Sequence, residues 1–218
     1  MATPQRAIFN GMGQNQWYVH LSRTEGADLG VIKSVLQDLR AACAAEDINL
    51  TLGIGPGLLP DLTDDVPDDF QAYVTVESED GSGREAKGTQ EELLLWLNHD
   101  DKDKVWKAQY DARTALEGHM AVARETPTFI YGDSLDMTGF KDGTGNPADE
   151  DQPAAAIVPD GAPGAGGSHI IAQRWVHDLD SWNALSDEQQ EKNFGRKKFP
   201  GIEKTESQEA YSHLSHVE

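Results

Sequence analysis

The chain contains the segment Gln16-Trp17-Tyr18-Val19-His20-Leu21 and, shortly after it, DLGVIKSVLQDLRAACAA at residues 28–45. Apolar residues alternate with others in the first segment, which predicts a β-strand with one buried face. They recur every three or four positions in the second, which predicts an amphipathic helix. The apolar stripe of this helix comprises Leu29, Ile32, Val35, Leu36, Leu39 and Ala42.

The same two patterns recur on the C-terminal side of this pair. Residues 93–97 are ambiguous, because Thr89-Gln90-Glu91-Glu92 fits a helix capping box while Leu93–Leu97 is equally good strand material. The order strand, helix, strands, helix, strand predicts a ferredoxin-like α+β unit whose antiparallel sheet is covered on one face. The further expected strands are 49–54, 70–77 and 120–131, and the second expected helix is 102–116.

The remaining part of the chain begins with a long connection. Residues 139–167 are rich in Gly, Pro, Ala and Asp and hold no period, and long ordered loops of this kind are often functional. A strand is expected over 169–179 and a helix over 180–194. A capping box at Ser186-Asp187-Glu188-Gln189 lies within this helix, and Gly195 follows it. These elements would open a second, incomplete strand–helix unit.

Composition excludes several classes of function. The chain has 218 residues, of which 38 are acidic and 18 basic, for a net charge of −20. Such a surface repels phosphate backbones and disfavours anionic substrates, so we expect no nucleic-acid partner. No apolar run approaches the ~20 residues of a membrane span, and Met1–Arg6 resembles no signal peptide, so we expect a cytoplasmic protein. Cys43, the only cysteine, excludes intrachain disulfides and Cys-based zinc sites.

The strongest local signal is Gly139-Phe140-Lys141-Asp142-Gly143-Thr144-Gly145-Asn146-Pro147. Its glycines permit close approach of the backbone to a flat ligand, and one carboxylate, Asp142, lies between them. Two other interpretations fit the residues alone. One is an acidic surface turn. The other is a calcium loop, although the EF-hand spacing is absent; its ligands would be Asp142, Asn146, Asp149 and Asp151.

This segment resembles the GxxDG signature of the dye-decolorising peroxidases, in the form followed by Thr-x-Asn-Pro. Three further blocks resemble the same family, in family order. They are Gly166-Gly167-Ser168 with 170–175 (IIAQRW), Trp182–Ser186 with Glu188–Glu191 and Gly195–Lys198, and Ser212-His213-Leu214-Ser215. The shorter, signal-free subclass fits best.

The resemblance implies a fold. It implies an α+β protein of two ferredoxin-like units with antiparallel sheets, of the dimeric α+β barrel type, the second unit being incomplete. The N-terminal domain would comprise residues 1–137 and the haem-binding domain residues 138–218. Relatives carry a distal arginine beyond the block that contains His213, whereas this sequence ends at Glu218. We therefore expect a C-terminally truncated form, in which no residue can be assigned as that arginine.

The resemblance also implies one haem b per chain. His213 matches the residue that ligates the iron, and His216, one helical turn away, is its closest competitor. Asp142 would transfer the peroxide proton as the O–O bond breaks, with a pKa raised by burial beside the porphyrin. Arg196 would pair with a haem propionate, the alternative being an exposed cation at a helix end. The haem edge would be lined by Gly143, Thr144 and Gly145.

The expected activity is that of a haem peroxidase, which uses hydrogen peroxide to oxidise dyes, phenols or similar one-electron donors. One alternative is a haem-binding or haem-delivery module with little turnover. Another is an acidic α+β interaction domain without a cofactor. The resemblance further implies a homo-oligomer and packaging as cargo of a protein nanocompartment, and no membrane partner is expected.

Overall fold

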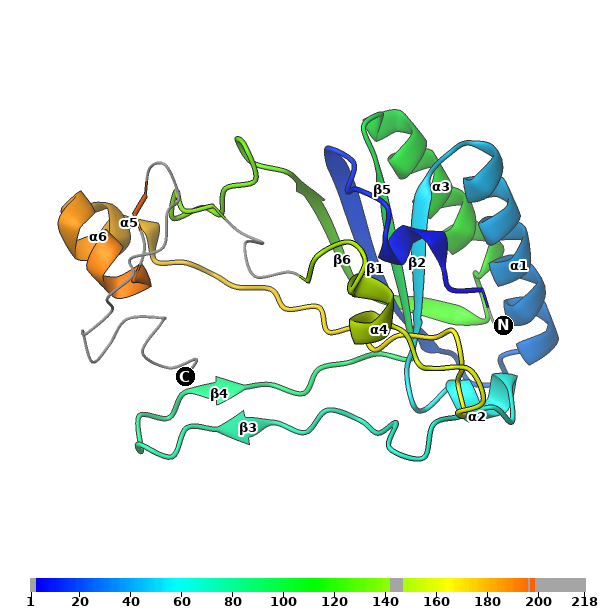
Figure 1. Cartoon of the computed structure of the whole chain (residues 1–218). Helices are drawn as coiled ribbons and strands as arrows, with labels where there is room; N and C mark the ends of the chain where they lie inside the picture. The colour runs from blue at the N-terminus through cyan, green and yellow to red at the C-terminus, as the bar shows by residue number, and fades with distance from the viewer. Residues whose placement is uncertain (1–2, 142–146, 196, 199–218) are drawn as a thin grey trace. The chain divides into compact units, whose positions relative to one another are not determined.

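A computed structural model describes residues 3–141, 147–195 and 197–198 (Figure 1). The chain forms two compact units. Unit 1 comprises Met1–Phe129 and Asp149–Ile170, and unit 2 comprises Ile130–Ala148 and Ile171–Glu218. The domain division into 1–137 and 138–218 stays a prediction.

Unit 1 is built on a four-stranded antiparallel sheet with the order β2-β5-β1-β6. Together with the two long helices, this order is that of a ferredoxin-like unit. The ambiguity over residues 93–97 is resolved in favour of a strand. The strands are β1 (Asn15–Arg23), β2 (Asn49–Ile54), β5 (Leu93–His99) and β6 (Met120–Phe129).

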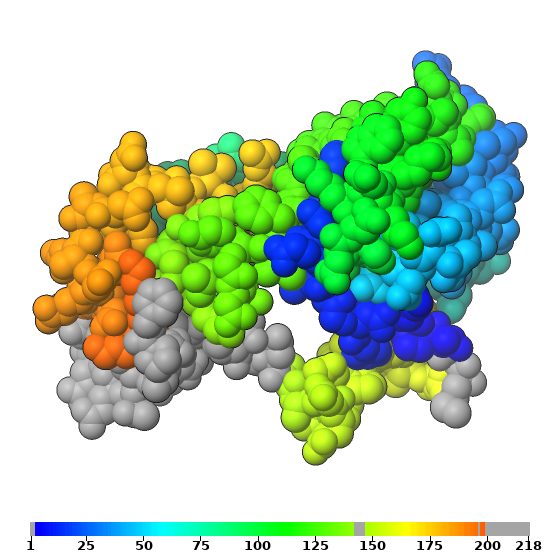
Figure 2. Space-filling model, turned by 90° about the horizontal axis from the view of Figure 1, so that it is seen from above, coloured from blue at the N-terminus to red at the C-terminus, as the bar shows by residue number. Residues whose placement is uncertain are grey.

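Helices α1 (Leu29–Ala45) and α3 (Lys102–Ala115) cover one face of this sheet (Figure 1). Each helix starts at an aspartate, because the Asp28 and Asp101 carboxylates accept hydrogen bonds from backbone N–H groups of the first turn. In the space-filling view, α1 (lighter blue) and α3 (green) form part of the visible surface of unit 1 (Figure 2). The core between helices and sheet includes Val19, Leu21, Ile32, Leu36, Leu93, Leu95, Leu97 and Val105.

The β2 edge of the sheet is closed by a side chain. The Gln5 amide donates from Nε2 to the Leu52 carbonyl over 2.9 Å and accepts from the Leu52 N–H at Oε1 over 2.8 Å. Gln5 precedes a short 3-10 helix, η1 (Arg6–Ile8). One side chain therefore satisfies both backbone groups that an added strand would pair with at Leu52.

The opposite face of the sheet is more polar. Tyr18 stacks on Trp96 with ring centroids 5.3 Å apart, and the Trp96 indole donates to Gln16 Oε1 over 3.0 Å. Burial raises the pKa of Tyr18 to about 12. Burial also lowers the pKa of His20, with the nearby Arg124 charge acting in the same direction and Glu91 opposing it. On this face, folding therefore shifts the pKa values of Tyr18 and His20 away from their ordinary values.

The segment between β2 and β5 differs from expectation. Only Val76–Glu77 (β3) of the predicted strand 70–77 is a strand, and it pairs with Glu85–Ala86 (β4) in a short hairpin. Val74 and Val76 are exposed. Because their side chains do not pack on a sheet surface, their high strand propensity does not produce a longer strand. A short helix, α2 (Leu59–Leu62), precedes this hairpin, and another, α4 (Gln152–Ala156), interrupts the long connection 139–167.

The described part of unit 2 is helical. The predicted helix 180–194 is two helices, α5 (Leu179–Asn183) and α6 (Asp187–Phe194), because the Ser186 capping box starts a new helix. The predicted strand 169–179 is wrong over its described length, where no β-pairing is formed before α5 begins at Leu179.

Candidate functional site

The residues predicted to carry the chemistry lie outside the described residues. They are Asp142, Gly143, Thr144, Gly145, Arg196 and His213, together with the competing His216. Their roles stay predictions. The structure does describe the segments that lead to Asp142 and Arg196, and these segments can be built up from their contacts.

Three aromatic side chains, the aromatic cluster, join these segments. Phe140 is 1% exposed and stacks on Phe194 with ring centroids 4.1 Å apart and the planes within 1°. Trp182 meets both rings edge-on, at 6.2 Å from Phe140 and 5.6 Å from Phe194. Aromatic pairs of this kind contribute about 0.5–1.5 kcal/mol beyond the burial of their area. The cluster is therefore the local core of unit 2.

The turn before Asp142 is held by hydrogen bonds. The Asp136 carboxylate accepts from the Thr138 N–H over 2.7 Å and also from the Thr138 hydroxyl. The Asp136 N–H donates to the Phe140 carbonyl over 2.9 Å, and Gly139, at φ 87°, turns the chain between them. The Trp182 indole donates to the Thr138 carbonyl over 3.0 Å. This turn is thus bound to the aromatic cluster both by packing and by a hydrogen bond.

Helix α5 starts at a well-bonded carboxylate. Asp178 accepts from the Ser181 hydroxyl over 2.6 Å and from the Ser181 N–H over 3.0 Å. These hydrogen bonds lower the pKa of Asp178 below its usual range, because they favour the charged form. The cap fixes the beginning of the helix that carries Trp182.

Helix α6 is defined at both ends. The Ser186 hydroxyl accepts from the Gln189 N–H, while the Gln189 side chain accepts from the Ser186 N–H. Gly195 ends the helix at φ 72°, the left-handed conformation that glycine adopts without strain. The predicted capping box and glycine stop are both confirmed.

A buried glutamine links α6 to α5 and to the residues after Gly195. Gln190 is 2% exposed and donates from Nε2 to the Trp182 carbonyl over 2.9 Å. Its Oε1 accepts from Lys198 Nζ over 2.7 Å. A Cβ on Gly139 would lie 3.0 Å from Lys198 Cε, so the turn before Asp142 and the segment after Arg196 are in close contact.

The sequence neighbours of Asp142 and of Arg196 therefore form one cluster. Both segments carry a recognisable motif, but no sequence pattern indicates a role for Thr138, Trp182 or Gln190. Trp182 and Thr138 are 44 residues apart in the chain, and no local pattern reports a contact at that separation. Gln190 gave no signal, because glutamine in a helix is usually exposed.

Comparison with known proteins relates these segments to one family. Residues 133–218 match the family model described as Dyp-type peroxidase, C-terminal. A dye-decolorizing peroxidase from Brevibacterium linens is 30% identical over 188 residues, which are 85% of this chain and 51% of that protein. One from Rhodococcus erythropolis is 33% identical over 56% of this chain and 36% of its own length. Residues 133–218 thus match the C-terminal part of the Dyp-type peroxidases, and the chain is similar to dye-decolorizing peroxidases over most of its length.

Comparison with solved structures points to the same group of proteins. A putative Dyp-type peroxidase from Shewanella oneidensis aligns over 98% of this chain and 72% of its own, with a TM-score of 0.88 and 25% identity. A DypB variant from Rhodococcus jostii in complex with heme aligns over 98% and 71%, with a TM-score of 0.85 and 25% identity. The predicted fold class, with its ferredoxin-like units, is confirmed. The chain spans about half the length of the Brevibacterium peroxidase.

Two further observations concern the described residues. No group of three or more His, Cys, Asp or Glu side chains within them could hold a metal ion. No helix in this part of the chain is long and apolar enough to cross a membrane. The predicted iron ligand, His213, lies outside the described residues.

Proposed function

We propose that this chain binds haem b and reduces hydrogen peroxide at the expense of aromatic one-electron donors such as dyes and phenols. The observation that supports this most directly is the aromatic cluster. It joins the turn before Asp142 to the helix end before Arg196. Proteins named dye-decolorizing peroxidases are 30% and 33% identical to this chain over 85% and 56% of its length, which also supports the proposal.

Exposed apolar side chains in the described part of unit 2 support the proposal. This part leaves several large apolar side chains exposed, and an apolar macrocycle or further chain would remove them from water. Two lysines follow α6. Lys197 forms an ion pair with Glu191, and Lys198 forms one with Asp187. The exposed apolar residues are Tyr131, Met137, Ile171, Trp175 and Val176.

Each predicted site residue has a distinct task in this proposal. His213 would hold the haem iron, which supplies the centre at which peroxide is reduced. Asp142 would take a proton from hydrogen peroxide and return it to the leaving oxygen, so that water departs. Arg196 would bind a propionate by two parallel hydrogen bonds. In balance, one hydrogen peroxide and two donors, each giving one electron and one proton, yield two waters and two donor radicals.

A visible-absorption titration with haem tests the cofactor. The wild-type chain should give a sharp Soret band that saturates at one haem per chain. His213→Ala should lose this band, whereas His216→Ala, the matched control, should keep it. Equal titrations for wild type and His213→Ala would overturn the assignment of the ligand.

Peroxide turnover tests the acid–base residue separately. Asp142→Asn should keep the Soret band but lower the rate of dye oxidation by about 100-fold or more, as removal of a general acid–base typically does. An unchanged rate would remove Asp142 from the mechanism. A Soret band without turnover in the wild type would indicate a haem-binding module. Homo-oligomerisation, nanocompartment packaging and a cytoplasmic location stay predictions.

A further inference from the structure

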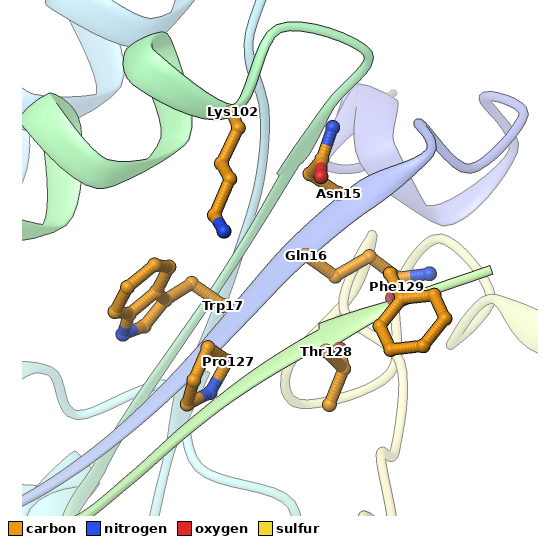
Figure 3. Close-up of a pocket in the computed structure, with 7 residues that line it drawn as sticks. All are labelled: Asn15, Gln16, Trp17, Lys102, Pro127, Thr128 and Phe129. Atoms are coloured by element: carbon orange, nitrogen blue, oxygen red, sulfur yellow. The ribbon is translucent and has the colours of Figure 1, made fainter. Parts of the chain in front are cut away.

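A surface hollow of about 320 Å³ lies at one edge of the unit 1 sheet, far in sequence from the predicted haem residues (Figure 3). It is formed where β1 begins, β6 ends and α3 starts. Its volume is at the small end of the range for ligand pockets, which suits a ligand of one or two rings. The lining residues are Asn15, Gln16, Trp17, Lys102, Pro127, Thr128 and Phe129.

The wall of this hollow is aromatic. Trp17 of β1 is half-buried, and Phe129, at the end of β6, is 57% exposed. Pro127 of β6 is paired in register with Trp17 of β1. Flat apolar surfaces of this kind bind other aromatic rings by stacking and by loss of hydration.

A chain of hydrogen bonds fixes the position of the Trp17 ring. Its Nε1 donates to Glu125 Oε1 over 2.8 Å, and Glu125 Oε2 accepts from the Arg113 guanidinium over 2.6 Å. Arg113 in turn donates to the buried Gln109 over 3.2 Å. A ring held in this way loses little conformational freedom when a ligand stacks on it.

Lys102 gives the hollow a local positive charge. It is the only charged residue of the lining, and within the described chain it makes no ion pair. Asp103 follows Lys102 directly, and the carboxylates of Asp100 and Asp101 on its other side accept backbone hydrogen bonds. Asp100 accepts from the Gln14 N–H over 2.9 Å, and Asp101 caps α3 by accepting from the Asp103 N–H over 2.9 Å. Lys102 is also the first residue of α3, where a cation gains nothing from the helix dipole.

We infer that this hollow binds a one- or two-ring aromatic carboxylate or sulfonate. The ring would lie against Trp17 and Phe129, and the anion would meet the ammonium of Lys102. The net charge of −20 predicts poor binding of anions in general. However, charges further away than about 8 Å are largely screened at physiological salt, and Lys102 is the charged residue that lines the hollow itself.

Binding at this hollow does not depend on haem. Its use as a place where an aromatic reductant is collected rests on the proposed peroxidase function. The test therefore measures binding alone, without haem or peroxide, so that its failure is separate from a failure of the haem assignment.

The test is a titration of the 218-residue chain with naphthalene-2-sulfonate, followed by the indole N–H resonance of Trp17 in ¹H–¹⁵N spectra. A Trp17→Phe variant assigns that resonance. The neutral 2-naphthylmethanol serves as the ligand control. Lys102→Gln removes the cation, Lys102→Arg restores it, and Lys33→Gln removes an exposed lysine of α1 as the matched control.

We expect the sulfonate to shift the Trp17 indole resonance and Lys102→Gln to weaken its binding by about two- to fivefold, the range of an exposed ion pair. Lys102→Arg and Lys33→Gln should bind as the wild type does. Phe129→Ala should weaken both ligands. An unmoved Trp17 resonance, equal binding of the two ligands, or equal effects of Lys102→Gln and Lys33→Gln would each overturn the inference.

Discussion

The buried side-chain amide of Gln190 forms hydrogen bonds with two separate parts of unit 2. It holds the Trp182 carbonyl and the Lys198 ammonium at once, and it is 2% exposed. Gln190→Ala removes both hydrogen bonds, while the Leu185 N–H still donates to the Trp182 carbonyl. At about 0.5–1.5 kcal/mol for each hydrogen bond, we expect unit 2 to lose about 1–3 kcal/mol of unfolding free energy. Urea denaturation followed by tryptophan fluorescence measures this loss. Gln173→Ala, at an exposed position, is the control, and equal midpoints for the two variants would contradict the role of Gln190.

His20 should make the stability of unit 1 depend on pH. Burial lowers its pKa in the folded chain, and Arg124 adds to this effect. The unfolded chain then binds more protons below a pH of about 6.5, so stability is complete above that pH and falls as the pH decreases toward the folded pKa. Urea midpoints at pH 7.5 and 5.5 should differ less for His20→Asn than for the wild type. His177→Asn, which replaces an exposed histidine, should keep the wild-type difference; a smaller difference in both variants would refute this assignment.

The sequence predicts residues for the site, but it does not predict the tertiary contacts of the segments that lead to them. The glycine-rich motif around Asp142 and the block containing His213 were recognisable because their residues are adjacent in sequence. The contacts between Phe140, Trp182 and Phe194 join positions that are distant in the chain. Such contacts depend on the tertiary fold, to which no local pattern corresponds.

Among the elements, α6 depends on its two ends. It has only eight residues, and short helices are marginal without caps or packing. Ser186→Ala removes the hydroxyl that accepts from the Gln189 N–H and should cost the helix about 1 kcal/mol. Hydrogen exchange of the α6 amides should become about fivefold faster, as that energy implies. Ser186→Thr keeps a hydroxyl and should exchange nearly as slowly as the wild type. If both variants exchange alike, the cap does not hold the helix.

Elements were predictable where a pattern coincided with tertiary partners. Alternation in β1 and helical spacing in α1 were correct, because the apolar side chains that produce these patterns are buried in one core. The segments 70–77 and 169–179 have equally strand-like compositions. Most of their residues have no neighbouring strand in the described chain, and Ile171, Trp175 and Val176 are exposed. Strand propensity reflects a fit to a sheet surface, so it failed where that surface is absent.

At the scale of the whole molecule, the two compact units contain separate cores. The unit 1 core includes Leu95, which is fully buried between sheet and helices, while the unit 2 core is the aromatic cluster around Phe140. We expect each unit to respond to changes in its own core. Large-to-small substitutions in such positions typically cost about 2–5 kcal/mol.

Hydrogen exchange measured for the two units in the same sample distinguishes their responses. Phe140→Ala should remove protection from the α6 amides and leave the amides of β1 and β5 protected as in the wild type. Leu95→Ala should raise exchange in β1 and β5 and leave α6 unchanged, which makes each variant the control for the other. If either substitution raised exchange equally in both units, the chain would unfold as one cooperative body, and the expected independence of unit 2 would be wrong.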